Sequence, residues 1–381
     1  MRGIIGLILA GLGAFLILVA VLLPTWVVGQ VVKFPLNEYE TATLEASNAS
    51  YFSTTSLSEK TGVSLEATYT IKGDGSAGNS STAVWNENSY VYDLTNHQLV
   101  QQPSRTFAFN RRTAQLVNCC GASVNGDTSV RQTGLVGYVF PFGTQKQTYQ
   151  VFNTSLKKTV PFVYSGTTSV DGVQAYEFVQ NVPPTQIGSQ TLPGSLVKSS
   201  AASVTLGEYD QEHVIYYVDP ETGALIDVNE QQSTTLRASA SAAPALVGFD
   251  ADLIATPASV TQIVALDSSG RNELTLIETT LPIVLGIVGG VALLAGILLG
   301  RKRHEDMAEL DDVSREVAPD SGQAAVSEQD GVSGEPAVSG SGRHAAERAG
   351  IVPGLGDETA ELAADRRDGE GPDGHGSPSA G

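Results

Sequence analysis

Two uninterrupted apolar stretches flank a long and mostly polar middle. The first covers residues 3–23 and the second covers residues 281–299, and neither contains a charged side chain. At 1.5 Å of rise per residue, helices of this length match a hydrocarbon core of about 30 Å. The pattern therefore predicts two transmembrane helices, and we place the second of them at residues 279–300.

The first stretch could be either a removable secretion signal or a retained anchor. It holds about 20 apolar residues, whereas the apolar core of a signal usually spans about 7–15. The segment that follows Pro24, TWVVGQVVKF, lacks the small-residue pattern of a cleavage site. We therefore expect a retained N-terminal anchor over residues 1–29, with Pro24 ending the helix and Trp26 at the membrane interface.

The basic residues around the two stretches predict their orientation. Arg2 precedes the first stretch, and Arg301, Lys302 and Arg303 follow the second. Since segments rich in Lys and Arg stay on the cytoplasmic side, both termini are expected in the cytoplasm. The chain is thus predicted to be a two-pass plasma-membrane protein whose residues 30–278 are extracytoplasmic.

Small residues recur within both apolar stretches. They are Gly6, Ala10 and Ala14 in the first, and Gly286, Gly290, Gly296 and Gly300 in the second. Small side chains allow helices to approach closely in lipid, but glycine is also frequent in membrane helices generally. The pattern leaves two interpretations open: an antiparallel pair of packed helices, or two helices without mutual contact.

The middle of the chain alternates between apolar and polar residues, as half-buried strands do. Strands are expected over residues 63–71 and 83–94. A hairpin is expected around Arg111-Arg112, between residues 106–110 and 114–118. These segments indicate antiparallel β structure.

Two longer hairpins carry clear turn sequences. Asp171-Gly172 separates the two β-rich halves of residues 160–182, and Asp-Gly provides the positive φ angles of a type I′ turn. A second hairpin over residues 213–236 turns at the sequence DPETG. Between the hairpins, Pro183-Pro184 and Pro193-Gly194 predict a loop.

The predicted fold class is a mainly β ectodomain, an antiparallel curved sheet or a sandwich, tethered by two transmembrane α-helices. Helix returns at Thr256-Pro257, where a capping residue precedes proline at the first helical position. We expect a break at residues 268–270 and a second helix from residues 273–278 into the membrane span. Residues 301–381 are rich in Gly, Ala, Ser, Pro, Asp and Glu, which predicts an acidic disordered cytoplasmic tail.

Charge and motifs restrict the chemistry. The formal net charge is −19, so nucleic acid is not an expected partner, because a phosphate backbone requires a basic surface. The sequence contains no G-x-S-x-G, H-E-x-x-H, P-loop or dinucleotide-binding motif. His97 and His213 lie far apart in the middle region, and His213 is expected at a strand edge. The sequence therefore predicts no enzyme, no cofactor and no metal site.

Cys119 and Cys120 are the two cysteines of the chain and are adjacent. Free thiols outside the cytoplasm tend to oxidise, and these two have only each other. Across a trans peptide their Cα atoms are about 3.8 Å apart, which is shorter than in most disulfides. Two states are open: a vicinal disulfide that stiffens the turn, which we favour, or two reduced and buried thiols at a strand end.

A local reversal of charge covers residues 105–158, which contain Asp127 as their one acidic residue. The basic residues of the run are Arg105, Arg111, Arg112, Arg131, Lys146, Lys157 and Lys158. They are candidate contacts for anionic lipid headgroups or envelope polymers. The alternative, which we favour, is that they pair with the acid-rich segment over residues 205–230 inside the fold.

The order of several short motifs resembles that of a known family. NCCG (118–121) is followed by FPFGTQKQTY (140–149), FVQNVPPTQIG (178–188), LPGSL (192–196), VDPETG (218–223) and TTLPIVLG (279–286). This run is similar to the actinobacterial porin PorA family, and the resemblance covers residues 1–303. The family name implies a pore, and the resemblance supplies no catalytic residues. Two apolar helices without a polar stripe cannot line an aqueous channel alone, so a pore would require several copies.

The leading hypothesis is that the ectodomain binds an envelope lipid, or an envelope partner such as a protein or a polymer. An oligomeric channel component, formed by copies of this chain, is the alternative, and an uncharacterised enzyme comes third. A curved sheet leaves an apolar interior unless side chains fill it. Candidate contacts for an acyl chain are Phe107, Phe109, Phe140 and Phe142. In the competing interpretation these rings pack against one another in a filled core.

Overall fold

The computed structural model describes residues 2–316, so most of the predicted disordered tail, residues 317–381, lies outside the described residues. The helical elements are α1 (Arg2–Leu22), a π-helical turn (Leu23–Val27), α2 (Val28–Val31), a 3₁₀ turn (Gly194–Val197), α3 (Pro257–Thr275), a second π-helical turn (Leu276–Thr280) and α4 (Leu281–Glu316). The strands are β1 (Tyr39–Ser53), β2 (Ser58–Gly73), β3 (Thr82–Asp93), β4 (Gln98–Gln101), β5 (Ser104–Asn110), β6 (Leu116–Val117), β7 (Ser123–Val124), β8 (Tyr149–Asn153), β9 (Lys158–Val170), β10 (Val173–Pro193), β11 (Ser203–Val218), β12 (Leu225–Arg237) and β13 (Leu246–Ala255).

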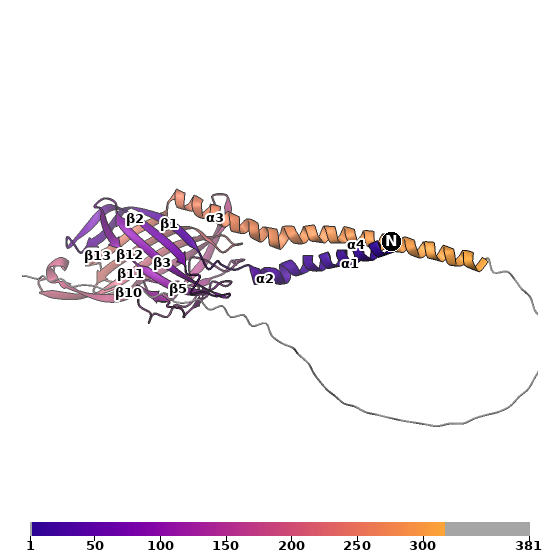
Figure 1. Ribbon diagram of the computed structural model, residues 1–381. Coiled ribbons are helices and arrows are strands. Elements are labelled where there is room, and N and C mark those ends of the chain that lie inside the picture. The colour runs from indigo at the N-terminus through magenta and orange to yellow at the C-terminus, as the bar shows by residue number, and fades with distance from the viewer. Residues whose placement is uncertain (1, 317–381) are drawn as a thin grey trace, which may run out of the picture. The chain divides into compact units, whose positions relative to one another are not determined.

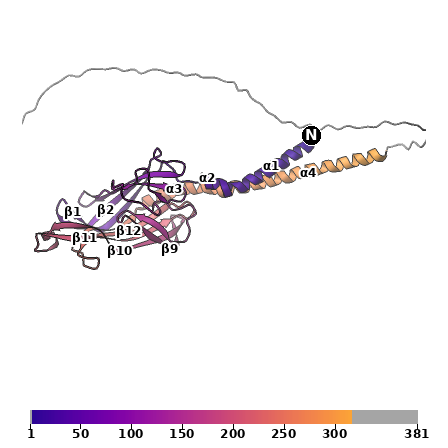
Figure 2. The same cartoon turned by 90° about the horizontal axis from the view of Figure 1, so that it is seen from below.

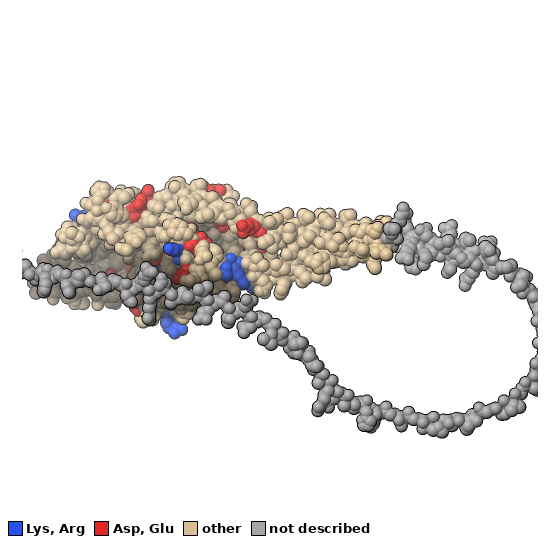
Figure 3. All heavy atoms as spheres, in the orientation of Figure 1, with Lys and Arg blue, Asp and Glu red and all other residues tan. Residues whose placement is uncertain are grey.

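Two helical segments are long and apolar enough to span a membrane, Ile4–Val31 and Pro257–Arg301. Where these helices project from the β domain, their visible face shows no Lys, Arg, Asp or Glu (Figure 3). The prediction that Pro24 ends the first helix is wrong. A π-helical turn, Leu23–Val27, accommodates Pro24, which has no N–H to donate to the preceding turn, and the helix continues to Val31.

The break predicted at residues 268–270 is also wrong, because these residues lie within α3. The helix begins after the cap Thr256, as expected, and runs unbroken through Ser268 and Ser269. Their hydroxyls donate to the carbonyl oxygens of Val264 and Ala265 one turn earlier. These two hydrogen bonds satisfy hydroxyl groups that would otherwise compete for the helical backbone. The helix therefore continues into the second π-helical turn and α4.

Helices α1 and α4 lie side by side in antiparallel orientation (Figures 1 and 2). A Cβ atom added to Gly13 would lie 2.5 Å from the backbone nitrogen of Leu293. One added to Gly296 would lie 2.5 Å from that of Ala10. The two backbones are therefore in contact, which confirms the packed pair. Gly290 has no atom within 4 Å of its Cβ position, so only part of the predicted glycine pattern lies at this interface.

The strands form one curled antiparallel sheet of 13 strands (Figure 1). Its order is β6-β5-β3-β2-β1-β13-β12-β11-β10-β9-β8, with β4 on β3 and β7 on β5. The N-terminal strands thus occupy one half of the sheet and the C-terminal strands the other. The first and last strands, β1 and β13, pair at the seam between the two halves.

A short segment, Gly134-Leu135, bridges the two edges of the sheet, and we call it the edge strap. The amide of Leu116 in β6 donates to Gly134 O at 2.8 Å, and the amide of Leu135 donates to Gln150 O at 2.7 Å. Gly134 has a φ of +84°, and an added Cβ would lie 2.5 Å from Gln150 O, so glycine is required. Both edge strands therefore have partners at this point, which limits edge-to-edge association.

The hairpin turns agree with their sequences, but the predicted loop begins at Pro193-Gly194 and not at Pro183-Pro184. Asp171 and Gly172 have φ angles of +45° and +84°, as a type I′ turn requires. Strand β10 continues through Pro183-Pro184, where the pairing with β11 shifts register between Val182 and Thr185. A register irregularity tolerates proline, which cannot donate to the ladder, so these prolines lie within a strand.

The two largest hydrophobic clusters of the described residues form the core of the curled sheet. In the first, Val260 and Ile263 of α3 pack with Leu44 and Leu253 of the sheet. The second is aromatic and includes Trp85. Phe107, Phe109 and Phe140 are fully buried within it. The prediction that these three rings contact an acyl chain is therefore wrong, because they pack against other core rings.

Candidate functional site

A cavity of about 510 Å³ lies inside the curled sheet, and we call it the polar cavity. Its polar lining includes Glu87, Arg105, Gln180, Asp210, Glu212, Glu230 and Gln232, together with the tyrosines Tyr69, Tyr138 and Tyr216. An interior rich in carboxyl and amide groups is unusual, because such groups are costly to bury without partners. The interior that was expected to be apolar is therefore polar at this end.

Strand alternation places these side chains on one inner face. Asp210 and Glu212 stand two residues apart on β11, and Glu230 and Gln232 stand two residues apart on β12. Glu212 is paired with Gln232 across the two strands. Because alternate residues of a strand share a face, the local sequence of these strands suffices to gather the polar groups once the sheet has curled.

Arg105 lies on the opposite wall of the polar cavity and is 5% exposed. Its Nε donates to Gln132 Oε1 at 2.8 Å, and its Nη1 donates to Val136 O at 3.0 Å. The guanidinium also lies over the rings of Phe107 and Phe152, at 4.7 Å and 5.1 Å from their centroids. Its Nη2 has no hydrogen-bond partner in the structure. The side chain is therefore fixed, with one donor left over.

The carboxyl groups are only partly satisfied. Glu212 accepts hydrogen bonds from Asn153 Nδ2 and from Gln180 Nε2. Asp210 Oδ1 accepts from Thr234 Oγ1 at 3.0 Å, but its Oδ2 has no partner. Glu87 Oε2 is likewise buried without a partner. Burial raises the pKa of Glu212 well above its usual range, with neighbouring Asp210 adding to the effect, and burial raises the pKa of Glu230 to about 7.

We expect the unliganded protein to lose thermal stability as the pH rises from about 5 to about 9. The raised pKa values of Glu212 and Glu230 mean that the folded protein keeps protons that an unfolded chain, with a glutamate pKa of about 4.3, has released. This stabilisation is complete below the unfolded pKa and is lost as the pH rises through the folded pKa. The melting temperature of the full chain in nanodiscs, measured across this range, tests the expectation.

Glu212→Gln should flatten this pH dependence and raise the melting temperature most at alkaline pH. Exposed Glu59 provides the control, because Glu59→Gln should leave the curve unchanged. A wild-type curve that stays flat to alkaline pH would contradict the proposed burial of these acids.

A second cavity of about 500 Å³ is mainly apolar and lies next to the ends of the membrane helices, and we call it the membrane-proximal groove. Its lining includes Val31 at the end of α2 and Ile277 of the second π-helical turn. Phe34 and Phe142 also line it, with their rings stacked at 4.4 Å between centroids. Phe142 is thus the one member of the four phenylalanines that lies where an apolar ligand could reach it.

A small cavity of about 90 Å³ lies between these two, and we call it the neck. It shares Tyr69, Tyr216 and Glu230 with the polar cavity, and it shares Leu225 with the groove. Tyr138 lines all three cavities. The apolar groove, the neck and the polar cavity therefore form a series from the membrane-proximal end into the interior.

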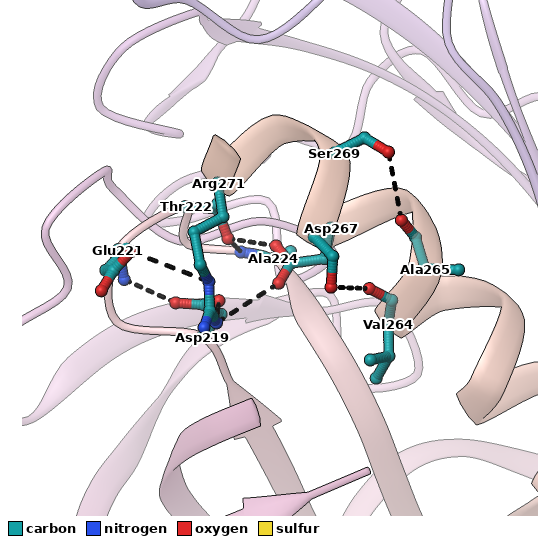
Figure 4. Close-up of polar contacts among 10 residues, drawn as sticks. Asp219, Glu221, Thr222, Ala224, Val264, Ala265, Asp267, Ser269 and Arg271 are labelled. Carbon is teal, nitrogen blue, oxygen red and sulfur yellow. Dashed lines mark hydrogen bonds and ion pairs between the residues drawn. The ribbon is translucent and has the colours of Figure 1, made fainter. Parts of the chain in front are cut away.

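A polar cluster holds α3 against the turn between β11 and β12 and forms part of the groove wall (Figure 4). Arg271 forms an ion pair with Asp219 and lies 3.7 Å from Asp267 Oδ2. Thr222 Oγ1 donates to Asp267 Oδ1. The side chains of Asp219 and Asp267 are almost wholly buried, so the guanidinium is the main group that compensates their charge.

The basic run does not form a single surface. Arg105 lies in the interior, whereas Arg111 donates through Nε to Phe34 O at 2.6 Å, beside the groove. Exposed Arg112 lies beside Gly29 of α2. The other exposed members are Arg131, Lys146, Lys157 and Lys158, of which Lys146 lies over two tyrosine rings and Lys157 is 3.9 Å from Asp127.

The favoured prediction that this run pairs with residues 205–230 is wrong for the described part of the chain. The ion pairs of Asp219 and Glu221 there go to Arg271 of α3. Arg111 and Arg112 remain candidate headgroup contacts, because they lie next to the end of the first membrane helix.

The structure joins Cys119 and Cys120 by a disulfide in a turn next to β6. Cys120 and Gly121 have φ angles of +61° and +80°, and the Cys120 side chain is exposed. The exposure of Cys120 contradicts the alternative in which both thiols are buried. The oxidation state of the pair stays a prediction.

If the vicinal disulfide forms in the membrane protein, alkylation without a reductant should add no label, and reduction should raise the intact mass by two hydrogens. Since the bridge closes no long loop, its loss should cost less than the roughly 3 kcal/mol of an ordinary disulfide. Uptake of two alkyl groups by the folded and unreduced protein would refute this prediction.

Among the side chains of residues 4–301, no group of three or more His, Cys, Asp or Glu is arranged to hold a metal ion. The polar cavity therefore offers hydrogen bonds and charge rather than metal coordination. A β-rich domain with a polar interior and an apolar groove, carried by two apolar helices long enough to span a bilayer, defines the class of a membrane protein.

Residues 5–298 match the family described as Porin PorA, and the chain belongs to this family. A protein of Corynebacterium resistens named "Porin PorA" is 33% identical over 73 residues. That match covers 19% of this chain and 18% of the relative, so it spans less than a fifth of either protein. The resemblance that the sequence motifs indicated is thereby confirmed at the level of the family.

Proposed function

We propose that this membrane protein binds an envelope amphiphile, with the apolar part in the membrane-proximal groove and the polar headgroup in the polar cavity. The observation that carries the proposal is the series of three cavities, which share Tyr138. One end of the series is apolar and lies beside the membrane helices, and the other is lined by carboxyl and amide groups. This gradient of polarity matches that of a lipid.

The position of the groove supports entry from the membrane. Its lining includes Val31 and Val32 after the first membrane helix, and Leu274 and Ile277 before the second. An amphiphile leaving the outer leaflet would meet these side chains first, with Arg111 and Arg112 beside them. In this proposal the protein binds or passes on lipid and does not catalyse a reaction.

Mass spectrometry of lipids that co-purify with the full chain tests the proposal. Ala42 lines the neck, so Ala42→Phe should block it and lower the amount of bound lipid several-fold. Ala240→Phe, at an exposed position, is the matched control and should retain the wild-type amount. If no lipid co-purifies and none raises the melting temperature, the domain is instead a docking module for an envelope protein or polymer.

We further propose that both termini are cytoplasmic and that residues 30–278 are extracytoplasmic, on the basis of the flanking Arg and Lys residues. Ser80→Cys should react with a membrane-impermeant thiol reagent in intact cells. Ser327→Cys, which lies outside the described residues, should be protected until the cells are broken. These variants are made in a Cys119→Ser/Cys120→Ser background, and labelling of position 327 in unbroken cells would refute the topology.

An oligomeric channel is the second candidate function. The family description and the printed name of the Corynebacterium relative favour it. The contact between α1 and α4 is made by glycine and alanine backbones, so an aqueous path would have to form between copies of the chain. Ion conductance across a planar bilayer containing the purified protein tests this function, and conductance that Ala42→Phe leaves unchanged would separate it from lipid binding.

A further inference from the structure

We propose that the polar cavity accepts a headgroup that carries hydrogen-bond donors and no negative charge, and that it rejects anionic amphiphiles. The inference rests on the proposed function, because it takes the ligand of the cavity series to be an amphiphile. It specifies which chemical class of headgroup the inner end recognises, and it is opposite in sign to the anionic headgroups that the basic run suggested.

The first step is the set of acceptors that the protein leaves unsatisfied. Glu87 is 9% exposed and Asp210 is fully buried, and both line the polar cavity. Glu87 Oε2 and Asp210 Oδ2 have no hydrogen-bond partner. A buried acceptor without a partner is costly, so native structures rarely keep one without a reason. Hydroxyl or ammonium groups of a headgroup would satisfy both atoms.

The second step is the balance of charge around the cavity. The lining holds five acidic side chains, Glu87, Glu208, Asp210, Glu212 and Glu230, against Arg105 and Lys157. Lys157 is about half exposed and lies 3.9 Å from Asp127, outside this set. Because burial raises the pKa values of Glu212 and Glu230, an anionic group in the cavity at neutral pH would meet like charge mainly at the other three acidic side chains, and a like-charge contact in a buried site is unfavourable.

The third step is the single free donor. Two nitrogens of Arg105 are occupied by Gln132 and Val136, and its ring contacts fix the guanidinium plane. The remaining Nη2 has no partner and can donate to one neutral oxygen of the headgroup. The unsatisfied groups are thus two acceptors and one donor. A hydroxyl-bearing headgroup fits all three, and an ammonium-bearing headgroup fits the two acceptors.

Three probes with the same dodecyl chain test the inference: dodecyl glucoside, dodecylammonium and dodecyl phosphate. The full chain is placed in nanodiscs at neutral pH, and bound probe is measured by native mass spectrometry. The same measurement on Ala42→Phe corrects for partitioning into the disc. The glucoside or the ammonium probe should bind at least about tenfold more tightly than the phosphate.

Two variants test whether the carboxyl groups of Glu87 and Asp210 accept hydrogen bonds from the headgroup. Glu87→Gln and Asp210→Asn remove charge but keep the side-chain volume, and each should weaken dodecylammonium more than dodecyl glucoside. Glu59→Gln, at an exposed position, should change neither. A preference for the glucoside indicates hydroxyl donors, a preference for the ammonium indicates a cationic headgroup, and either result supports the inference.

The experiment distinguishes failure of the headgroup inference from failure of the proposed function. If dodecyl phosphate binds as tightly as the other two probes, the inference on the headgroup is overturned while amphiphile binding stands. If none of the probes binds above the level of Ala42→Phe, the proposed function fails and the inference fails with it.

Discussion

Replacing Arg271 with methionine is expected to lower the free energy of unfolding by about 3 kcal/mol. The side chains of Asp219 and Asp267 are 0% and 1% exposed, and Arg271 compensates both. Removing one partner of a buried ion pair costs far more than the pair itself contributes, because the remaining charge stays desolvated. The thermal or denaturant unfolding of the full chain in nanodiscs measures the loss.

Matched variants separate this effect from a general loss of positive charge. Exposed Lys158→Met should change stability by less than about 0.5 kcal/mol. The triple variant Asp219→Asn, Asp267→Asn and Arg271→Met removes all three charges and should recover much of the stability lost by Arg271→Met alone. An Arg271→Met protein as stable as Lys158→Met would show that the cluster does not hold α3 in place.

Replacing Gly13 with leucine is expected to separate α1 from α4. Any Cβ at this position would lie 2.5 Å from Leu293 N and 2.6 Å from Gly289 O, and backbone atoms cannot move aside as a side chain can. Overpacking of this kind costs about 2 kcal/mol, roughly a thirtyfold shift in the pairing of the two helices. Gly290→Leu is the control, because its Cβ position is open.

A disulfide between the two helices reports their pairing. The Cβ position of Gly6 lies 3.3 Å from Leu299 Cβ, which is close to the separation of a disulfide. Gly6→Cys and Leu299→Cys, in a Cys119→Ser/Cys120→Ser background, should therefore cross-link in the membrane. Gly13→Leu should abolish most of this cross-link and Gly290→Leu should preserve it. Equal yields in both variants would contradict the helix contact.

The features that depended on neighbouring residues could be predicted from the sequence. The two apolar stretches and the Asp171-Gly172 turn require only a short window of chain, because membrane span length and turn conformation are local properties. The breaks expected at Pro24 and at residues 268–270 were also inferred from a short window of chain, and they were wrong because the helix compensates locally for both sequences. A π-helical turn accommodates Pro24, and the hydroxyls of Ser268 and Ser269 donate to the preceding helical turn. The amino-acid composition predicts neither feature.

The contact between the membrane helices shows what a one-helix pattern cannot determine. The sequence pointed to Gly6, Ala10 and Gly296, which lie at the contact. It also pointed to Gly286 and Gly290, which do not, and it missed Gly13 and Gly289, which do. Which glycine faces the partner depends on the rotation and register of both helices together. Spacing within one helix defines several stripes of small residues, and packing selects one of them.

The polar cavity could have been foreseen only in part. Asp210 and Glu212 share a strand face with buried Val214, so carboxyl groups on a core-facing side were a signal in the sequence. Their convergence with Arg105 and Glu87 depends on the curl of the whole sheet, which brings β3, β5, β11 and β12 around one space. No local pattern encodes that closure.

The seam between β1 and β13 constrains the order in which the ectodomain can be completed. Residues of β1 such as Leu44 and Ser50 pair with Ala255 and Asp250, which lie 200 or more positions later in the chain. Each half of the sheet is built from near neighbours and can assemble before the other half is complete. The edge of β1, however, stays open until β13 has been synthesised. Closure of the seam is therefore expected late in folding, because it joins residues far apart in the sequence, and a chain interrupted before β13 would leave a long unpaired strand exposed to other chains.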